Sequence, residues 1–190
     1  LLAIANTSDE VSKKINNNFG DEDNFAEQQE ILLSKIALDK KYKPKSSLDD
    51  NVVKQIQVVR NAVKENMLSN PGLVTDKDCV EYLTLRGKGW VCENDGTIIG
   101  FAIADLIDNN IWALFVHPEY DKQGIGKKLH DMMLNWYFGQ QKEKVWLSTG
   151  PNTRAEKFYR KAGWTEVGTH GTKEIKFEMT YNDWTTSPNR

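Results

Sequence analysis

A chain of 190 residues can build one domain with a full hydrophobic core, and it is short for two. Its formal net charge of -2 leaves no global field that would attract nucleic acid or an anionic membrane, so any anion site must be local. No apolar run approaches the roughly 20 residues that span a bilayer, and the opening stretch Leu1–Ala5 is too short and lacks the basic flank of a secretion signal. We therefore expect a cytoplasmic protein that binds neither nucleic acid nor membranes.

The two cysteines, Cys79 and Cys92, fall on different predicted elements. Neither belongs to a Cys-x-x-Cys motif or stands at metal-ligand spacing from a histidine. A disulfide would also not suit a reducing compartment. We expect two reduced, packed thiols and no metal site.

Residues 1–50 are predicted to form an N-terminal extension. Asn24 is a typical helix N-cap with Glu27 at the third helical position, which predicts a helix at about 25–41. Residues 43–51 are predicted to be a linker, and residues 52–190 the main domain. Because the chain begins with leucine, we also expect it to be a trimmed or processed piece.

The main domain is expected to begin with a short strand at Gln55–Val59, followed by a helix that carries Ala62, Val63 and Met67. Thr75 is predicted to cap a second helix that runs to about Leu85. Glycines at 87 and 89 would end that helix.

A meander of strands is predicted next. Two β-rich runs flank Asp95-Gly96, a dipeptide that readily takes the positive φ angles of a tight hairpin turn. A second turn at 108–110 leads into a strand at Ile111–Val116. These segments predict three antiparallel strands.

Helical spacing resumes at Ile125 and continues through Leu129, Met133 and Tyr137. A strand is predicted at 144–148, and Thr153 with Glu156 has the pattern of a capping box that opens a short helix. Closing strands are predicted at about 164–169 and 173–180. Hairpins imply antiparallel pairs and helical crossovers imply parallel ones, so we expect a mixed α/β domain.

The glycine cluster Gly124-Ile125-Gly126-Lys127 lies between a predicted strand and a predicted helix. Glycines there can serve a plain turn, or they can bring a phosphate to the amide groups at the positive end of the helix. The P-loop pattern is absent, and Leu129 stands where a dinucleotide fold needs its third glycine. Taken alone, the cluster leaves both alternatives open.

A second segment, Asn152 to Trp164, follows this cluster. In this order the two segments resemble the [Q/R]-x-x-G-x-[G/A] and N-x-x-A-x-x-x-Y-x-x-x-G-[F/W] motifs of the GNAT superfamily of acetyl-CoA-dependent N-acetyltransferases. The resemblance covers about residues 54–181 and excludes the first 50. It implies a mixed, mostly antiparallel sheet of six to seven strands flanked by about four helices.

The resemblance also implies acetyl-CoA as co-substrate. The strand before the glycines would pair with the pantetheine arm, and the following amides would surround the pyrophosphate. One departure is Asp121, at the motif's Q/R position; we expect it to point away from the phosphates, with Lys122, Lys127 or Lys128 offsetting its charge. The implied cofactor-binding residues are Leu114, Val116, Lys122, Gln123, Gly124, Ile125, Gly126, Lys127, Asn152 and Phe158.

For chemistry, the resemblance places Tyr159 in the general-acid position, where a phenol is protonated at neutral pH. The family's basic glutamate position is Asn110 here, which cannot act as a base. The base stays unassigned, with Asp105, Asp108, His117 and Glu174 as possible substitutes. His130 is expected on the polar side of the long helix and His170 in a loop.

We expect an acetyltransferase that moves the acetyl group of acetyl-CoA to a primary amine of a small molecule or peptide by direct attack in a ternary complex. A non-catalytic acyl-CoA-binding regulatory module and a nucleotide-triphosphate binder remain alternatives. The acceptor pocket is expected near residues 66–74 and 166–175, with one or two tryptophans in its wall. A homodimer is also possible.

Overall fold

The computed structural model describes residues 50–66 and 74–186. The predicted helix at 25–41 and Met67 lie outside these ranges. Asp50 and Asn51, which the sequence placed in a linker, are already helical.

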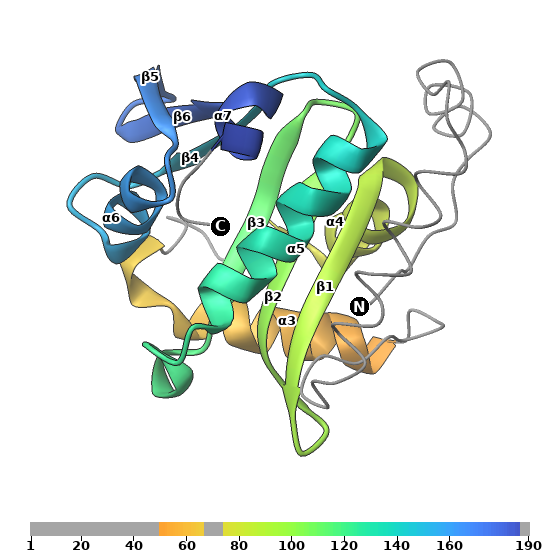
Figure 1. The fold of residues 1–190 in the computed structure, drawn as a ribbon. Helices are drawn as coiled ribbons and strands as arrows, with labels where there is room; N and C mark the ends of the chain where they lie inside the picture. Colours follow the sequence, from red (N-terminus) through yellow and green to blue (C-terminus); the bar gives the residue numbers. More distant parts are fainter. Residues whose placement is uncertain (1–49, 67–73, 187–190) are drawn as a thin grey trace.

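A six-stranded sheet of order β1-β2-β3-β4-β6-β5 forms the centre of the fold (Figure 1). Every neighbouring pair is antiparallel except β3 and β4, which are parallel. This confirms the predicted mixed, mostly antiparallel α/β fold. The strands are β1 (Gly87–Asn94), β2 (Thr97–Asp105), β3 (Asn110–Val116), β4 (Val145–Thr149), β5 (Thr165–His170) and β6 (Glu174–Met179).

The predicted meander is β1, β2 and β3. Asp95 and Gly96 both have positive φ angles, 48° and 80°, as a two-residue hairpin turn requires. At the other end of β1, a Cβ on Gly87 would lie 1.8 Å from the Ala104 carbonyl oxygen, so the close approach of β1 to β2 needs glycine there.

The strand predicted at Gln55–Val59 is wrong, because these residues belong to helix α3 (Asp50–Ala62). Their β-branched residues favour a strand by propensity. However, Val52, Ile56 and Val59 recur at helical spacing and are all nearly inaccessible, so burial of this face against the sheet determines the structure.

The second predicted helix is confirmed as α4 (Asp76–Glu81), which continues as a π-helical turn over Tyr82–Arg86. The Thr75 hydroxyl accepts from the Asp78 amide at 3.2 Å, and the Asp78 carboxylate accepts from the Thr75 amide at 2.7 Å. This reciprocal capping box fixes where the helix begins.

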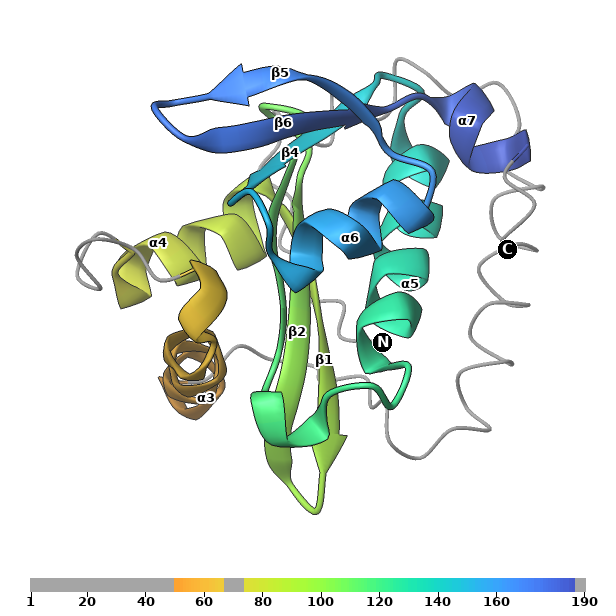
Figure 2. The ribbon, with the colours of Figure 1, turned by 90° about the vertical axis from the view of Figure 1, so that its left-hand side faces the viewer.

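Helices cover both faces of the meander, as Figure 2 shows. On one face lie α5 (Ile125–Gln140) and α6 (Arg154–Lys161), followed by α7 (Tyr181–Thr186), which the sequence did not predict. On the other face lie α3 and α4. Two hydrophobic clusters fill these layers, one under α5 and α6 and one under α3 and α4.

Both cysteines are reduced and buried, as predicted. His130 differs from the prediction, because it is 1% exposed and not on the polar side of α5. Its Nε2 accepts from Trp164 Nε1 at 2.9 Å, and its Nδ1 lies 3.0 Å from Asp131. A neutral ring that donates from Nδ1 satisfies both contacts, so His130 links α5 to the end of α6.

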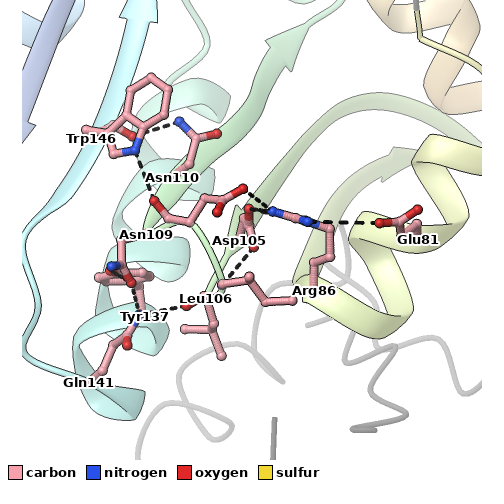
Figure 3. Close-up of polar contacts among 11 residues, drawn as sticks. Glu81, Arg86, Asp105, Leu106, Asn109, Asn110, Tyr137, Gln141 and Trp146 are labelled. Carbon is pink, nitrogen blue, oxygen red and sulfur yellow. Dashed lines mark hydrogen bonds and ion pairs between the residues drawn. The ribbon is translucent and has the colours of Figure 1, made fainter. Parts of the chain in front are cut away.

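The parallel strands β3 and β4 are joined at one point only, where Asn110 faces Trp146. There the Asn110 amide donates to the Trp146 carbonyl at 3.2 Å, as Figure 3 shows. Beyond this pair the strands diverge without further pairing. A split sheet leaves backbone and side-chain groups of both strands available to a ligand.

Among the described residues, no helix is both long and apolar enough to cross a bilayer.

Candidate active site

A cavity of about 280 Å³, here called the first cavity, lies at the split between β3 and β4, against the start of α5 and α6. Most of the residues predicted from the motifs come together in its wall. These are Leu114, Val116, Lys122, Gly124, Ile125, Gly126, Phe158 and Tyr159.

The start of α5 can bind an anion. Gly124 is its N-cap, with a left-handed φ of 78°, and it offers no side chain to cap the helix. A Cβ added to Gly124 would have no neighbour within 4 Å, so the space in front of the first helical turn is open. Uncapped amides at the positive end of a helix dipole suit a phosphate group.

Thr149 is a residue that the sequence did not single out. It is 1% exposed, lines the first cavity, and its buried hydroxyl has no hydrogen-bond partner. Buried hydroxyls are normally paired. A bound ligand with a polar group could supply the missing partner.

Three predicted binding residues, Gln123, Lys127 and Asn152, are not in the wall of this cavity. Lys127 forms an ion pair with Asp131 at 2.5 Å, one helical turn on. Asn152 has a φ of 62°, and its backbone amide donates to the Glu156 carboxylate at 2.6 Å. In the predicted capping box, the Glu156 carboxylate would accept from the Thr153 amide. It accepts from the amide of Asn152, one residue earlier.

Asp121 lines the first cavity, whereas the sequence predicted that it points away. Its charge is offset by an ion pair with Arg154 at the start of α6, a partner that the sequence did not predict. Arg154 also forms an ion pair with Glu65 at 2.9 Å. The hydrogen bond with the Glu65 carboxylate is the largest influence on the pKa of this guanidinium, and it raises that pKa. Burial opposes the rise, and the charge of Asp121 adds to it.

Tyr159 is 7% exposed and packs against Trp164 and Phe177. Burial raises the pKa of its hydroxyl above the usual value for tyrosine. The group therefore stays protonated at neutral pH, as a proton donor must.

A second cavity, of about 400 Å³, opens between α3, β3, β4 and the β5–β6 hairpin. The two cavities share wall residues at the split of the sheet: Ile111, Trp112, Ala113, Phe115 and Ser148. The two cavities are therefore neighbours on either side of these shared residues.

Of the four possible bases, Glu174 is the one whose carboxylate lines the second cavity without an ion pair of its own. It accepts a hydrogen bond from the Ser148 hydroxyl at 2.6 Å. Asp105 and Asp108 also line this cavity, but Arg86 binds both of them. His117 lies in neither wall, since it caps the turn Pro118–Tyr120.

Aromatic rings form much of the second cavity. Tyr82 and Trp112 stack with centroids 4.2 Å apart, and Trp146 packs on His170 at 5.0 Å. His170 is the last residue of β5, and not part of a loop as predicted. Val74, His170 and Glu174, from the ranges expected to form the acceptor pocket, line this cavity.

A sequence model of the acetyltransferase (GNAT) family matches residues 63–164. No curated protein sequence matches the chain.

Solved structures share the fold. PH1933 from Pyrococcus horikoshii OT3 has a TM-score of 0.62 at 19% identity and covers 75% of this chain and 98% of its own. The PaiA N-acetyltransferase of Thermoplasma acidophilum, in complex with coenzyme A, has a TM-score of 0.59 at 20% identity, with 70% and 96% covered. The ribosomal-protein-S18-alanine N-acetyltransferase of Escherichia coli has a TM-score of 0.55 at 18% identity, with 70% and 89% covered.

Proposed function

This chain belongs to the acetyltransferase (GNAT) family, and we propose that it moves the acetyl group of acetyl-CoA to a primary amine of a small molecule or peptide. The observation that carries the proposal is the pair of cavities that meet at Ser148. A donor in one and an acceptor in the other would form a ternary complex in which the amine attacks the thioester directly. Two reactants held in contact need no covalent enzyme intermediate.

The first cavity suits acetyl-CoA. Gly124 and the uncapped first turn of α5 would take the pyrophosphate, and the divergent edge of β3 at Leu114 and Val116 would pair with the pantetheine arm. The unpaired Thr149 hydroxyl would meet a polar group of that arm. The coenzyme A bound to the Thermoplasma neighbour supports this choice of donor.

Glu174 is the proposed base, acting through Ser148. An ammonium group in the second cavity would pass a proton to this carboxylate by way of the Ser148 hydroxyl, which leaves a neutral amine at the split. The amine nitrogen then forms a bond to the acetyl carbon, the carbon–sulfur bond breaks, and the nitrogen gives its second proton to solvent as the amide forms.

Tyr159 is the proposed acid. It would give its hydroxyl proton to the leaving thiolate, and solvent would restore that proton. The raised pKa of the buried phenol keeps it protonated until the thiolate forms.

Release of free thiol from acetyl-CoA over a panel of primary amines tests the proposal. We expect release with some amines, and a loss of about 100-fold or more in turnover for Glu174→Gln. Glu178→Gln is the matched control, because Glu178 lies on the same strand, pairs with Lys144 at 2.7 Å, and lines neither cavity. Equal turnover in the two variants would remove Glu174 as the base.

Asn110 favours a second candidate, a non-catalytic acyl-CoA-binding regulatory module. This residue stands at the family's usual base position, and an amide cannot act as the base. The amide donates a hydrogen bond to the Trp146 carbonyl. Tight binding of acetyl-CoA without thiol release for any amine would support this candidate. For either function, the proposed location is the cytoplasm.

A further inference from the structure

Arg60 carries a guanidinium that forms no ion pair with any acid in the described part of the chain. It lies near the end of α3 and lines the second cavity. Its Nη1 atom is buried and has no hydrogen-bond partner. Burial lowers the pKa of this guanidinium, yet arginine stays charged in proteins.

Two acids of the neighbouring helix α4 have other partners. Asp78 accepts from the amide and the hydroxyl of Thr75 at 2.7 and 2.8 Å, and Asp76 accepts from Gln57 at 3.3 Å. The Asp78 charge opposes the effect of burial on the pKa of Arg60, yet among residues 50–66 and 74–186 no carboxylate forms an ion pair with this guanidinium. A buried polar group of this kind normally has a partner, and a ligand can provide it.

Two of the three carboxylates in the wall of the second cavity already have a cationic partner. Asp105 and Asp108 share Arg86, whose Nη2 lies 2.6 Å from the Asp105 carboxylate (Figure 3). Glu174 has only the neutral hydroxyl of Ser148. Two charges in the wall are therefore left for a ligand, the cation of Arg60 and the anion of Glu174.

These two charges come from different elements in the wall of the second cavity, Arg60 from α3 and Glu174 from β6. Glu174 accepts a hydrogen bond from Ser148, which borders both cavities, so an ammonium group beside this pair would lie next to the first cavity. The stacked rings of Tyr82 and Trp112 form an apolar wall of the same cavity.

We infer that the second cavity takes a primary amine that also carries a carboxylate, with the ammonium group at Glu174 and the carboxylate on Arg60. A guanidinium binds a carboxylate through paired N–H donors, and one guanidinium matches one carboxylate in charge. A phosphate would bring more negative charge to a cavity that already holds three carboxylates. The inference rests on the proposed function in taking this cavity as the acceptor site.

Calorimetric titration tests it without relying on turnover. The enzyme, saturated with coenzyme A, is titrated with amino acids from glycine to 6-aminohexanoate, each compared with its own primary carboxamide. We expect at least one acid to bind about 10- to 100-fold more tightly than its amide, since a hydrogen bond to a charged group contributes that much. Equal affinities, or no measurable binding of any acid, would overturn the inference.

Arg60→Gln should abolish the preference for the acid. Lys54→Gln is the control, because it removes the same charge from an exposed position of the same helix and should leave the preference intact. A preference that survives Arg60→Gln would overturn the assignment. The comparison of acids and amides on the unaltered protein gives a result even if Arg60→Gln does not fold.

Thiol release on the same compounds separates this inference from the proposed function. Acetylation of acids and amides at equal rates would contradict the carboxylate site and support the acetyltransferase activity. Preferential binding of acids without any thiol release would contradict the acetyltransferase activity and support the carboxylate site.

Discussion

Replacement of Arg86 by methionine should destabilise the protein, because it leaves the buried Asp105 carboxylate without its cationic partner. The Asp105 side chain is 1% exposed, and it accepts from Arg86 Nη2 at 2.6 Å and from Arg86 Nε at 3.3 Å (Figure 3). Methionine keeps the apolar stem of Arg86 and removes both donors. Within the described part of the chain, the Asp105 carboxylate then keeps one hydrogen bond, from the Ile107 amide at 2.8 Å.

Removal of one partner of a buried ion pair costs about 3–5 kcal/mol. Since one hydrogen bond to Asp105 survives, we expect about 3 kcal/mol, a large share of the roughly 5–15 kcal/mol that stabilises a typical domain. Asp108 is another partner of Arg86, but its side chain is 64% exposed. Asp108→Asn should therefore cost less than about 1 kcal/mol, and it serves as the control.

The loss should depend on pH. Burial already raises the pKa of Asp105 against the opposing effect of Arg86, and removal of Arg86 should raise it further. A carboxyl whose pKa is higher in the folded state contributes stability that is present below its unfolded pKa, about 4, and is lost as pH rises through the folded pKa. The variant should thus differ most from the parent near about pH 7, and less as pH falls toward about 4.

Urea denaturation followed by tryptophan fluorescence measures the free energy of unfolding at both pH values. The double variant Arg86→Met/Asp105→Asn should recover part of the loss, because no charge is then buried without a partner. A loss below about 1 kcal/mol for Arg86→Met, or a loss that is equal at both pH values, would refute this account of the cluster.

Three further variants test the site. Tyr159→Phe should lower turnover about 100-fold or more with little change in acetyl-CoA affinity, as stopped-flow thiol release and calorimetry would measure; unchanged turnover removes Tyr159 as the acid. Gly124→Ala should lower the free energy of unfolding by about 1–2 kcal/mol, as thermal or urea unfolding would measure. The cause is the φ of 78° alone, since no atom lies within 4 Å of the new Cβ, and an unchanged stability would contradict this strain. Thr153→Ala should cost about 1 kcal/mol, because its hydroxyl accepts from the Glu156 amide at 3.1 Å and donates to the Gly150 carbonyl at 2.8 Å; a stability equal to that of the parent would show that the cap is dispensable.

Most of the fold was predictable because its signals are local. Asp95-Gly96 specified a hairpin through the φ angles it tolerates, and Thr75 and Thr153 each specified where a helix begins through one side-chain bond. Gln55–Val59 shows where local reasoning failed. Propensity favoured a strand for its valines, and the burial of one helical face against the sheet outweighed that preference.

The candidate donor site was also largely readable, because two motifs with strict spacing carry it. Gly124, Gly126 and Tyr159 come together in one cavity as expected. The partners of the charged groups were not readable. Asp121 meets Arg154 across 33 residues of sequence, and no spacing rule links the two.

By itself, the sequence determined the order of strands and helices between residues 75 and 180, the glycine turn into α5 and the position of the buried phenol. Each of these depends on neighbours within a few residues, through turn angles, caps and hydrophobic periodicity. Only the tertiary structure decided that Ser148 borders two cavities, that Arg86 neutralises Asp105, and that the buried Nη1 of Arg60 has no hydrogen-bond partner among the described residues. Such pairings arise where separate elements pack, and the angle and depth of that packing are properties of the whole core.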